Sequence, residues 1–245
     1  MHLLWLIPLG WLAGSAVNYF ADVLPAHRRL VQPFCAKCQV AVAWTHLIWP
    51  GGCPHCHAAK GLRYWLVQIG GLAVIGYLWY FPNPKLGFVL GLVWCLYFGV
   101  LAVIDMEHHL ILHPTSWFGA AIGLATGFGL HGLWPTLLGG AVGYGIMLGL
   151  YMTGKLFMRL VSRRSTVDAQ GVALGYGDVN LSGVIGLLLG WPAVIGGLVI
   201  GLLLSGMVSF IVLAVSVILR RYRAFQHSLP LGPFLISGAL ILFFW

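Results

Sequence analysis

Two of the chain's five acidic residues, Asp105 and Asp178, stand beside long apolar runs, where a charge is costly to bury. Asp105 follows the apolar part of "VLAVIDMEHHLILHPTS", and Asp178 follows a Gly-Tyr-Gly turn in "GYGDVNLSGVIGLLLGW". Two carboxyl groups held close together do not both ionise readily, so one keeps its proton while the other stays charged. Such a pair can take a proton from water and donate one to an amide carbonyl. The two aspartates are therefore candidates for peptide hydrolysis.

A second group with chemical potential is formed by four of the five cysteines. Cys35, Cys38, Cys53 and Cys56 follow the pattern C-x2-C-x14-C-x2-C, which is close to the spacing of a four-cysteine zinc ribbon. Two disulfides or free thiols are the alternative. Four thiolates leave no open coordination position, so this spacing predicts a structural zinc site. We interpret Cys95, which lies inside an apolar segment, as a packing residue.

The elements that carry these residues are predicted to be membrane helices. Of the 245 residues, 60% are hydrophobic and only 7% are charged, whereas a soluble domain usually carries about 25% charged residues. The net charge of +8 is scattered over short loops. This scatter is typical of membrane topology and argues against nucleic-acid binding.

Eight apolar segments approach or exceed the ~20 residues that cross a bilayer, although the sixth is short. They are approximately Leu3–Phe20, Leu62–Tyr80, Leu86–Ile104, Trp117–Leu133, Leu137–Phe157, Val179–Gly190, Ala193–Leu219 and Leu231–Trp245. The first segment lacks the basic start of a secretory signal, so we interpret it as a retained helix.

The basic residues set the predicted orientation. With both termini outside, the outer side receives only Lys85, and the inner loops receive all other lysines and arginines. These are Arg28, Arg29, Lys37, Lys60, Arg63, Lys155, Arg159, Arg163, Arg164, Arg220, Arg221 and Arg223. The cysteine loop then faces the reducing cytosol, where metal binding is favoured over disulfides.

In this topology both aspartates lie at the inner membrane face. Asp105 closes the third span and Asp178 opens the sixth, so packing of these helices would bring the carboxyl groups together. An ionisable residue at a membrane span is a functional-site candidate by default. Each aspartate alone has a simpler explanation. Either side chain could be solvated by water among the lipid headgroups at a helix end, and Asp178 could be stabilised by the dipole of the helix that it begins. Their matched depth favours chemistry.

The residues around the pair have predicted supporting roles. Gly175 and Gly177 would let a peptide approach the backbone beside Asp178. Glu107, two residues after Asp105, would point to another side of a continued helix and is an accessory or solvated residue. Asp22 is predicted to lie in headgroup water, and Asp168 in a polar loop.

These motifs, in this order, resemble the type IV prepilin peptidases, also called prepilin leader peptidases. "GYGD" looks like the G-x-G-D signature of membrane aspartyl proteases, and "DMEHHLI" accompanies it as in that family. "GSAVN", with Gly14, Ser15 and Asn18, resembles the family's G-S-x-x-N stretch, and "LPLGPFLISGA" resembles its P-x-G-P-F segment. G-x-G-D alone also occurs in presenilin-like proteins. The ordered combination, which covers nearly the whole chain, is the more specific sign.

The resemblance implies an endopeptidase that removes the short basic leader of a prepilin or pseudopilin, with Asp105 and Asp178 as the catalytic pair. Larger members of the family carry paired C-x2-C motifs and also methylate the new amino terminus with S-adenosylmethionine. The cysteines of this chain permit that second activity, although no motif specifies a binding site for the methyl donor. Asn180 is predicted to support the substrate or the backbone beside Asp178, and this sequence departs from the family there, because many members have lysine at this position.

The sequence thus predicts an all-α polytopic membrane protein of about eight transmembrane helices in the bacterial inner membrane, with a small cytosolic zinc-binding loop. The expected domains are residues 1–20 as a first helix, 21–61 as the zinc loop and 62–245 as the protease core. The expected partners are the precursor helix and the lipid bilayer, without nucleic acid. Two other interpretations stay open: a catalytically weakened prepilin-binding or assembly protein, and a transporter that binds cations at the aspartates.

Overall fold

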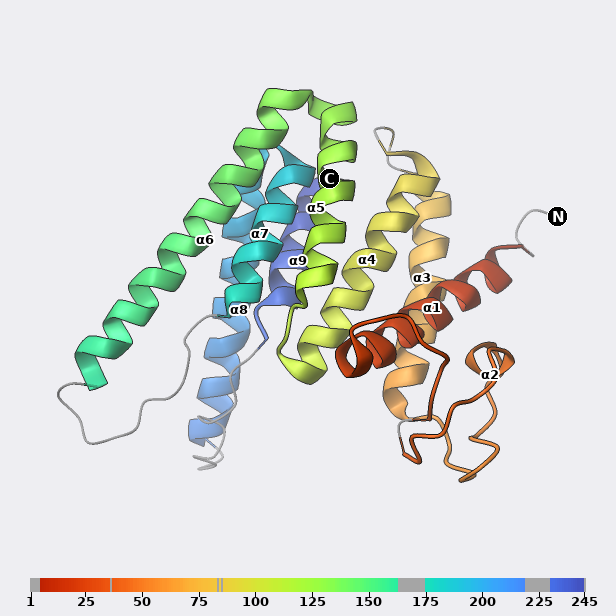
Figure 1. Cartoon of the computed structure of the whole chain (residues 1–245). Helices are drawn as coiled ribbons and strands as arrows, with labels where there is room; N and C mark the ends of the chain where they lie inside the picture. Colours follow the sequence, from red (N-terminus) through yellow and green to blue (C-terminus); the bar gives the residue numbers. More distant parts are fainter. Residues whose placement is uncertain are drawn as a thin grey trace. The chain divides into compact units, whose positions relative to one another are not determined.

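The computed structural model describes residues 5–35, 37–82, 84, 86–162, 175–218 and 230–244 (Figure 1). Its helices are α1 (Leu6–His27), α2 (Thr45–Ile48), α3 (Leu62–Tyr80), α4 (Gly87–His108), α5 (His113–His131), α6 (Leu133–Ser162), α7 (Tyr176–Leu189), α8 (Ala193–Ile218) and α9 (Gly232–Phe244). The regular structure of the described residues is otherwise limited to an isolated antiparallel bridge between Phe34 and Ala41. Asp168, Lys85, Arg163, Arg164, Arg220, Arg221 and Arg223 lie outside the described residues.

The prediction of an all-helical membrane protein is confirmed, and each of the eight apolar segments corresponds to a helix. Among the described helices, α4, α6 and α8 are long and apolar enough to cross a membrane, whereas α7 and α9 are apolar but shorter. α1, α3 and α5 have spanning length and are less apolar. The number of eight spans therefore stays a prediction.

Several helix ends differ from the predicted spans. α1 continues past Phe20 to His27, with Pro25 in its last turn, so Asp22 lies on a helix and forms a 2.7 Å ion pair with Arg63. α4 continues one turn beyond Ile104, and α5 begins at His113 rather than Trp117. These turns contain polar residues, which a search for apolar runs excludes although they remain compatible with a helix.

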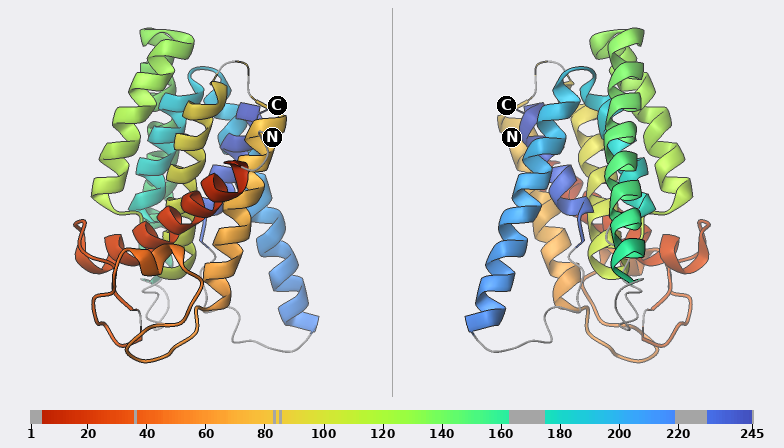
Figure 2. Two further views of the ribbon diagram at one scale, coloured as in Figure 1. Left: turned by 90° about the vertical axis from the view of Figure 1, so that its right-hand side faces the viewer. Right: turned by 90° about the vertical axis from the view of Figure 1, so that its left-hand side faces the viewer.

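The described chain divides into two compact units, Met1–Ile104 and Asp105–Trp245. In the first unit, α1 crosses α3 (Figure 2, left). Gly10 and Gly14 form a G-x-x-x-G pair on α1, and a Cβ at Gly10 would lie 2.9 Å from the Cα of Leu72. Small residues with this spacing allow two membrane helices to approach at backbone distance.

Buried polar side chains hold the same crossing together. Gln68, which is fully buried, donates from Nε2 to Ser15 Oγ and to the Tyr64 hydroxyl, each at 2.9 Å. Asn18 Nδ2 donates to the backbone oxygens of Gly14 and Tyr64, at 3.1 and 3.4 Å. The stretch Gly14, Ser15, Asn18 therefore serves here as a contact between α1 and α3.

The cysteine loop is fastened to these two helices through the short helix α2. A four-residue helix cannot satisfy its own carbonyl groups, and here side chains from outside α2 hydrogen-bond them. From α1, Trp11 Nε1 donates to Ile48 O at 2.7 Å, and from α3 the Tyr64 hydroxyl donates to Leu47 O at 3.3 Å. Within the loop itself, Lys60 Nζ donates to His46 O at 2.8 Å and to the oxygen of Trp49, the residue after α2, at 2.7 Å.

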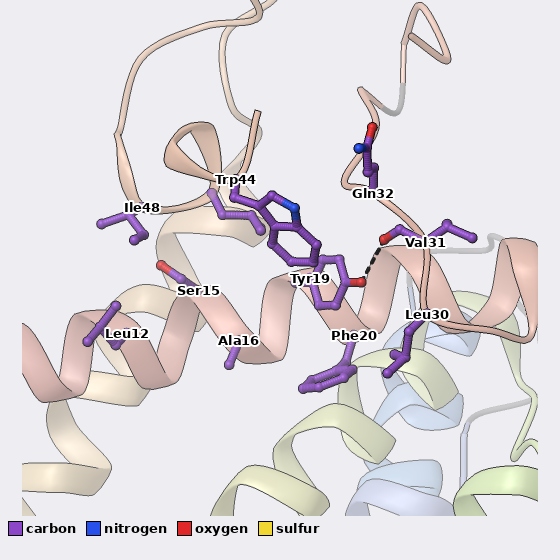
Figure 3. A pocket seen from close by; sticks show the side chains of 11 residues that line it. Leu12, Ser15, Ala16, Tyr19, Phe20, Leu30, Val31, Gln32, Trp44 and Ile48 are labelled. Carbon is purple, nitrogen blue, oxygen red and sulfur yellow. Dashed lines mark hydrogen bonds between the residues drawn. The ribbon is translucent and has the colours of Figure 1, made fainter. Parts of the chain in front are cut away.

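The start of the loop is attached in the same manner. The Tyr19 hydroxyl donates to Val31 O at 2.7 Å, and its ring packs against Trp44 with centroids 5.1 Å apart (Figure 3). Figure 3 shows these side chains at an apolar cavity of about 590 Å³ between α1 and the loop.

The second unit is built around α7. α6 packs against α7 through glycines, and a Cβ at Gly139 would lie 2.7 Å from the backbone of Gly190. α8 and α9 lie side by side (Figure 2, right). α5 and α6 join at one end and diverge from it, with α7 between them (Figure 1). α7 is consequently largely buried despite its length of 14 residues.

Candidate active site and metal centre

Asp105 lies on the last turn of α4 and is 5% exposed. The backbone N–H of Gly232, the first residue of α9, donates to Asp105 Oδ2 at 3.0 Å. A helix N-terminus carries unpaired N–H groups and a positive dipole end, both of which stabilise a nearby negative charge. The cost of burying this carboxyl group is therefore reduced by α9, a segment more than 120 residues away in the sequence.

Asp178 is the third residue of α7 and is 8% exposed. The backbone of Gly175, which precedes the helix, hydrogen-bonds its carboxyl group. This is the reciprocal half of a capping box, in which the third helical residue reaches back to the N-cap. Asp178 thus also lies at a helix N-terminus, and a Cβ at Gly175 would be 3.3 Å from its Oδ2.

The two carboxyl groups are near enough for the charge of Asp105 to act on Asp178. Both are buried, and each faces the N-terminus of a different helix. This arrangement suits a dyad that holds one negative charge and one proton, since two adjacent buried carboxylates would repel each other. Such a dyad can act as general base and general acid at one reaction centre.

Close backbone contact brings α7 to the segment that follows α4. A Cβ at Gly177 would lie 2.7 Å from Cβ of Ile111, so this contact needs glycine. The chain leaves α4 through His109, whose φ is 50° and whose N–H donates to Asp105 O at 2.9 Å. The absent side chain at Gly177 thus lets the start of α7 pack against the segment that follows the turn at His109.

The four predicted metal ligands also come together. Cys35, Cys38, Cys53 and Cys56 place their Sγ atoms within 4.8 Å of one another. The Sγ atoms of Cys35 and Cys56 are 3.7 Å apart, and those of Cys38 and Cys53 are 3.8 Å apart. A tetrahedron with Zn–S bonds of ~2.3 Å has S···S edges of ~3.8 Å, so the cluster fits a zinc ion.

The two C-x2-C turns have the same backbone geometry. Cys35 N donates to Val40 O and Cys53 N donates to Ala58 O, both at 3.0 Å. The residue after each second cysteine is left-handed, with φ of 59° at Gln39 and 52° at His57. In the first turn, the backbone N–H of Cys38 hydrogen-bonds the Cys35 thiol and lowers its pKa to about 6, whereas burial and the neighbouring thiols raise the pKa of Cys38 to about 11. Cys35 is therefore the first thiolate of this turn, and binding a metal deprotonates the other thiols.

A family model described as the type IV leader peptidase family matches residues 90–219. The matched segment is more than half of the chain and contains both buried aspartates. The chain belongs to this family.

Several named proteins are similar to the chain over most of its length. The chain is 30% identical over 280 residues to a prepilin leader peptidase/N-methyltransferase of Dickeya chrysanthemi, a match that covers 97% of this chain and 91% of the relative. A protein of the same name from Pseudomonas aeruginosa is 31% identical over 210 residues. This match covers 82% of the present chain but only 64% of the relative, which is less than two thirds of its length. One from Burkholderia pseudomallei is 29% identical, with 96% and 76% covered. No solved structure matches the chain.

Two residues with predicted supporting roles differ from the aspartates in exposure or direction. Glu107 is exposed, two residues beyond Asp105. Asn180 lies two residues after Asp178, about 200° around the helix, and lines a separate cavity with Tyr176. Two contacts were not predicted from the sequence. These are the hydrogen bond from Gly232 to Asp105, although the P-x-G-P-F segment that contains Gly232 was noted, and the close approach of Ile111 to Gly177. Proline directly after Gly232 is the local signal for a helix N-terminus there.

Proposed function

We propose that this protein is a membrane aspartyl endopeptidase that removes the short basic leader of type IV prepilins or pseudopilins. The observation that carries the proposal is the buried pair Asp105 and Asp178, each at the N-terminus of a helix, in a membrane protein of the leader peptidase family. The pair supplies a base and an acid at one place. It lies at the end of apolar helices, where a leader would meet the hydrophobic part of its precursor.

Cleavage follows from the shared proton. The ionised carboxyl group accepts a proton from water as the water oxygen attacks the scissile carbonyl carbon, and the protonated one donates to the carbonyl oxygen. The resulting gem-diol then collapses: the C–N bond breaks, the leaving nitrogen receives a proton, and the dyad returns to its singly protonated state. Because the two groups titrate together, the resting proton belongs to the pair.

In this proposal the cysteine loop has a structural role. Zinc held by four thiolates would fix the loop of residues 28–61, which follows α1, beside α1 and α3, with the membrane core from residue 62 onward carrying the chemistry. We place the protein in the bacterial inner membrane, with both termini outside and the dyad and the cysteine loop on the cytosolic side.

A second activity is favoured by the names of the relatives, each a prepilin leader peptidase/N-methyltransferase. We propose that the newly exposed amino terminus is methylated. S-adenosylmethionine would supply the methyl group, and the amine of the cleaved substrate would accept it.

The test is a cleavage assay in liposomes with co-reconstituted prepilin-like substrates. Mass spectrometry of the product is expected to show the leader removed and, with S-adenosylmethionine present, the mass of one added methyl group on the new amino terminus. Absence of cleavage across several precursors, combined with proton or cation flux through the liposomes, would favour the transporter interpretation. Precursor binding without cleavage would favour the assembly protein.

The contact between Gly232 and Asp105 yields a further prediction. A Cβ at Gly232 would lie 2.6 Å from Asp105 Oδ2, so Gly232→Ala must displace the carboxyl group or the start of α9. Misplacement of a catalytic group by ~1 Å can cost ~10²-fold in rate, and we expect the rate of leader cleavage to fall by ~10- to 100-fold. Gly206→Ala on α8 is the control, because its added methyl meets no atom within 4 Å. An unchanged rate in Gly232→Ala would contradict this role of α9.

A further inference from the structure

The second unit contains a groove whose lining includes neither Asp105 nor Asp178. It has a volume of about 680 Å³ and is lined by residues of α5 and α6 on its sides and of α7 on its floor. Figure 1 shows α5 and α6 diverging on either side of α7. Its walls carry Ala120 from α5 and Ala141 from α6, and its floor includes Gly183 and, toward one end, Leu187. We call this the α5–α7 groove.

The groove changes character along its length. Leu137, Val184 and Leu187 line it toward the turn between α5 and α6, whereas His113, Asn180 and Tyr176 line it toward the start of α7. At the latter end the hydroxyl groups of Tyr144 and Tyr176 are 2.6 Å apart and connect α6 to α7. An occupant that fits would be apolar over most of its length and polar where it reaches the start of α7.

The polar end is level with the proposed catalytic pair. Tyr176 and Asn180 flank Asp178 on α7, but they face the groove while Asp178 faces Asp105 on the other side of the helix. Among the described residues, the N-terminus of α7 lies between the polar end of the groove and the proposed catalytic pair. Gly175, directly before it, is exposed and has no side chain to obstruct a peptide that crosses from one side to the other.

We propose that the α5–α7 groove binds the apolar helix of the substrate that follows the scissile bond, so that the preceding extended residues cross Gly175 and reach the dyad. This inference rests on the proposed peptidase function. From Tyr176 to Leu187 the floor is ~16 Å long at 1.5 Å per residue, which matches three turns of a bound helix. Small residues on both walls and on the floor permit the backbone-level contact typical of helix pairs in membranes. A lipid chain or a second copy of this protein is the competing occupant.

The proposal is tested by placing larger side chains in the groove. Ala120→Trp and Ala141→Leu place bulk in the cavity, while Ala121→Trp, on the neighbouring exposed position of α5 outside the groove lining, is the matched control. KM for a full-length precursor is expected to rise at least 10-fold in both groove variants and to stay at the wild-type value in Ala121→Trp. A precursor peptide truncated after the first few residues beyond the scissile bond should be cleaved equally by wild type and all three variants, because it has no helix to place.

Photo-cross-linking provides a readout independent of turnover. A benzophenone amino acid at position 120 or 141, in an Asp178→Asn background that retains the precursor, is expected to cross-link to the apolar helix of the precursor, and one at position 121 is not. Cross-links to lipid or to a second copy alone, or an unchanged KM in the groove variants, would overturn the groove assignment while wild-type cleavage leaves the peptidase function intact. Absence of cleavage by wild type would instead count against the function itself, and the cross-links would still decide what occupies the groove.

Discussion

Replacement of either Asp105 or Asp178 by asparagine is expected to reduce the rate of leader cleavage by ~10²- to 10⁴-fold, the range that a single general acid or base supplies. Asparagine keeps the size of the side chain and an oxygen that can accept the N–H of Gly232, yet it cannot exchange a proton at neutral pH. The two residues act as a unit, so the double variant should be no slower than the slower single variant. Product formation is measured by mass spectrometry of the new amino terminus.

The folded state and an unrelated acid provide the controls for the dyad variants. Asp168→Asn changes an acid that is predicted from the sequence to lie in a polar loop with Arg163 and Arg164, and it should leave cleavage unchanged. Each variant should elute from a sizing column like wild type and retain its metal. Cleavage within a few-fold of wild type in either Asp105→Asn or Asp178→Asn would exclude the dyad mechanism, whatever the other variant shows.

Loss of the proposed zinc ion is expected to have the second large effect. Structural zinc sites bind with ~10–16 kcal/mol in small domains, and that binding energy is folding energy. Cys53→Ser removes the buried ligand of the cluster, and we expect zinc content to fall from about one ion per chain to background. Residues 28–61 should then become sensitive to limited proteolysis, as they should after treatment of wild type with a chelator.

The fifth cysteine offers a matched control for metal loss. Cys95 is a free cysteine on α4 and is not part of the four-cysteine cluster, so Cys95→Ser should retain zinc and resist proteolysis. Zinc is quantified by elemental analysis of purified protein, and the proteolytic sites are identified by mass spectrometry. Full resistance in metal-free Cys53→Ser would show that the hydrogen bonds from Trp11, Tyr19, Lys60 and Tyr64 hold the loop without the ion.

Sequence alone determined the features that depend on local pattern. Long apolar runs with few charges predict helices in a membrane, because buried backbone groups must bond within their own segment, and every such run is a helix. The spacing of the four cysteines predicts a tetrahedral cluster, because each C-x2-C turn supplies two thiols and a single contact between the two turns brings all four together. The family follows from the ordered motifs, and it is confirmed by the match over residues 90–219.

Tertiary structure alone decided which distant atoms surround the aspartates. No local pattern reveals that the N–H of Gly232 faces Asp105, or that Ile111 requires a glycine at position 177, because these contacts depend on how separate helices pack. Residue spacing placed Asn180 near Asp178 in sequence, yet helix geometry turns it toward the α5–α7 groove. The sequence pattern of a helix predicts which of its residues are buried. Which other helix covers those residues depends on how all the helices pack together.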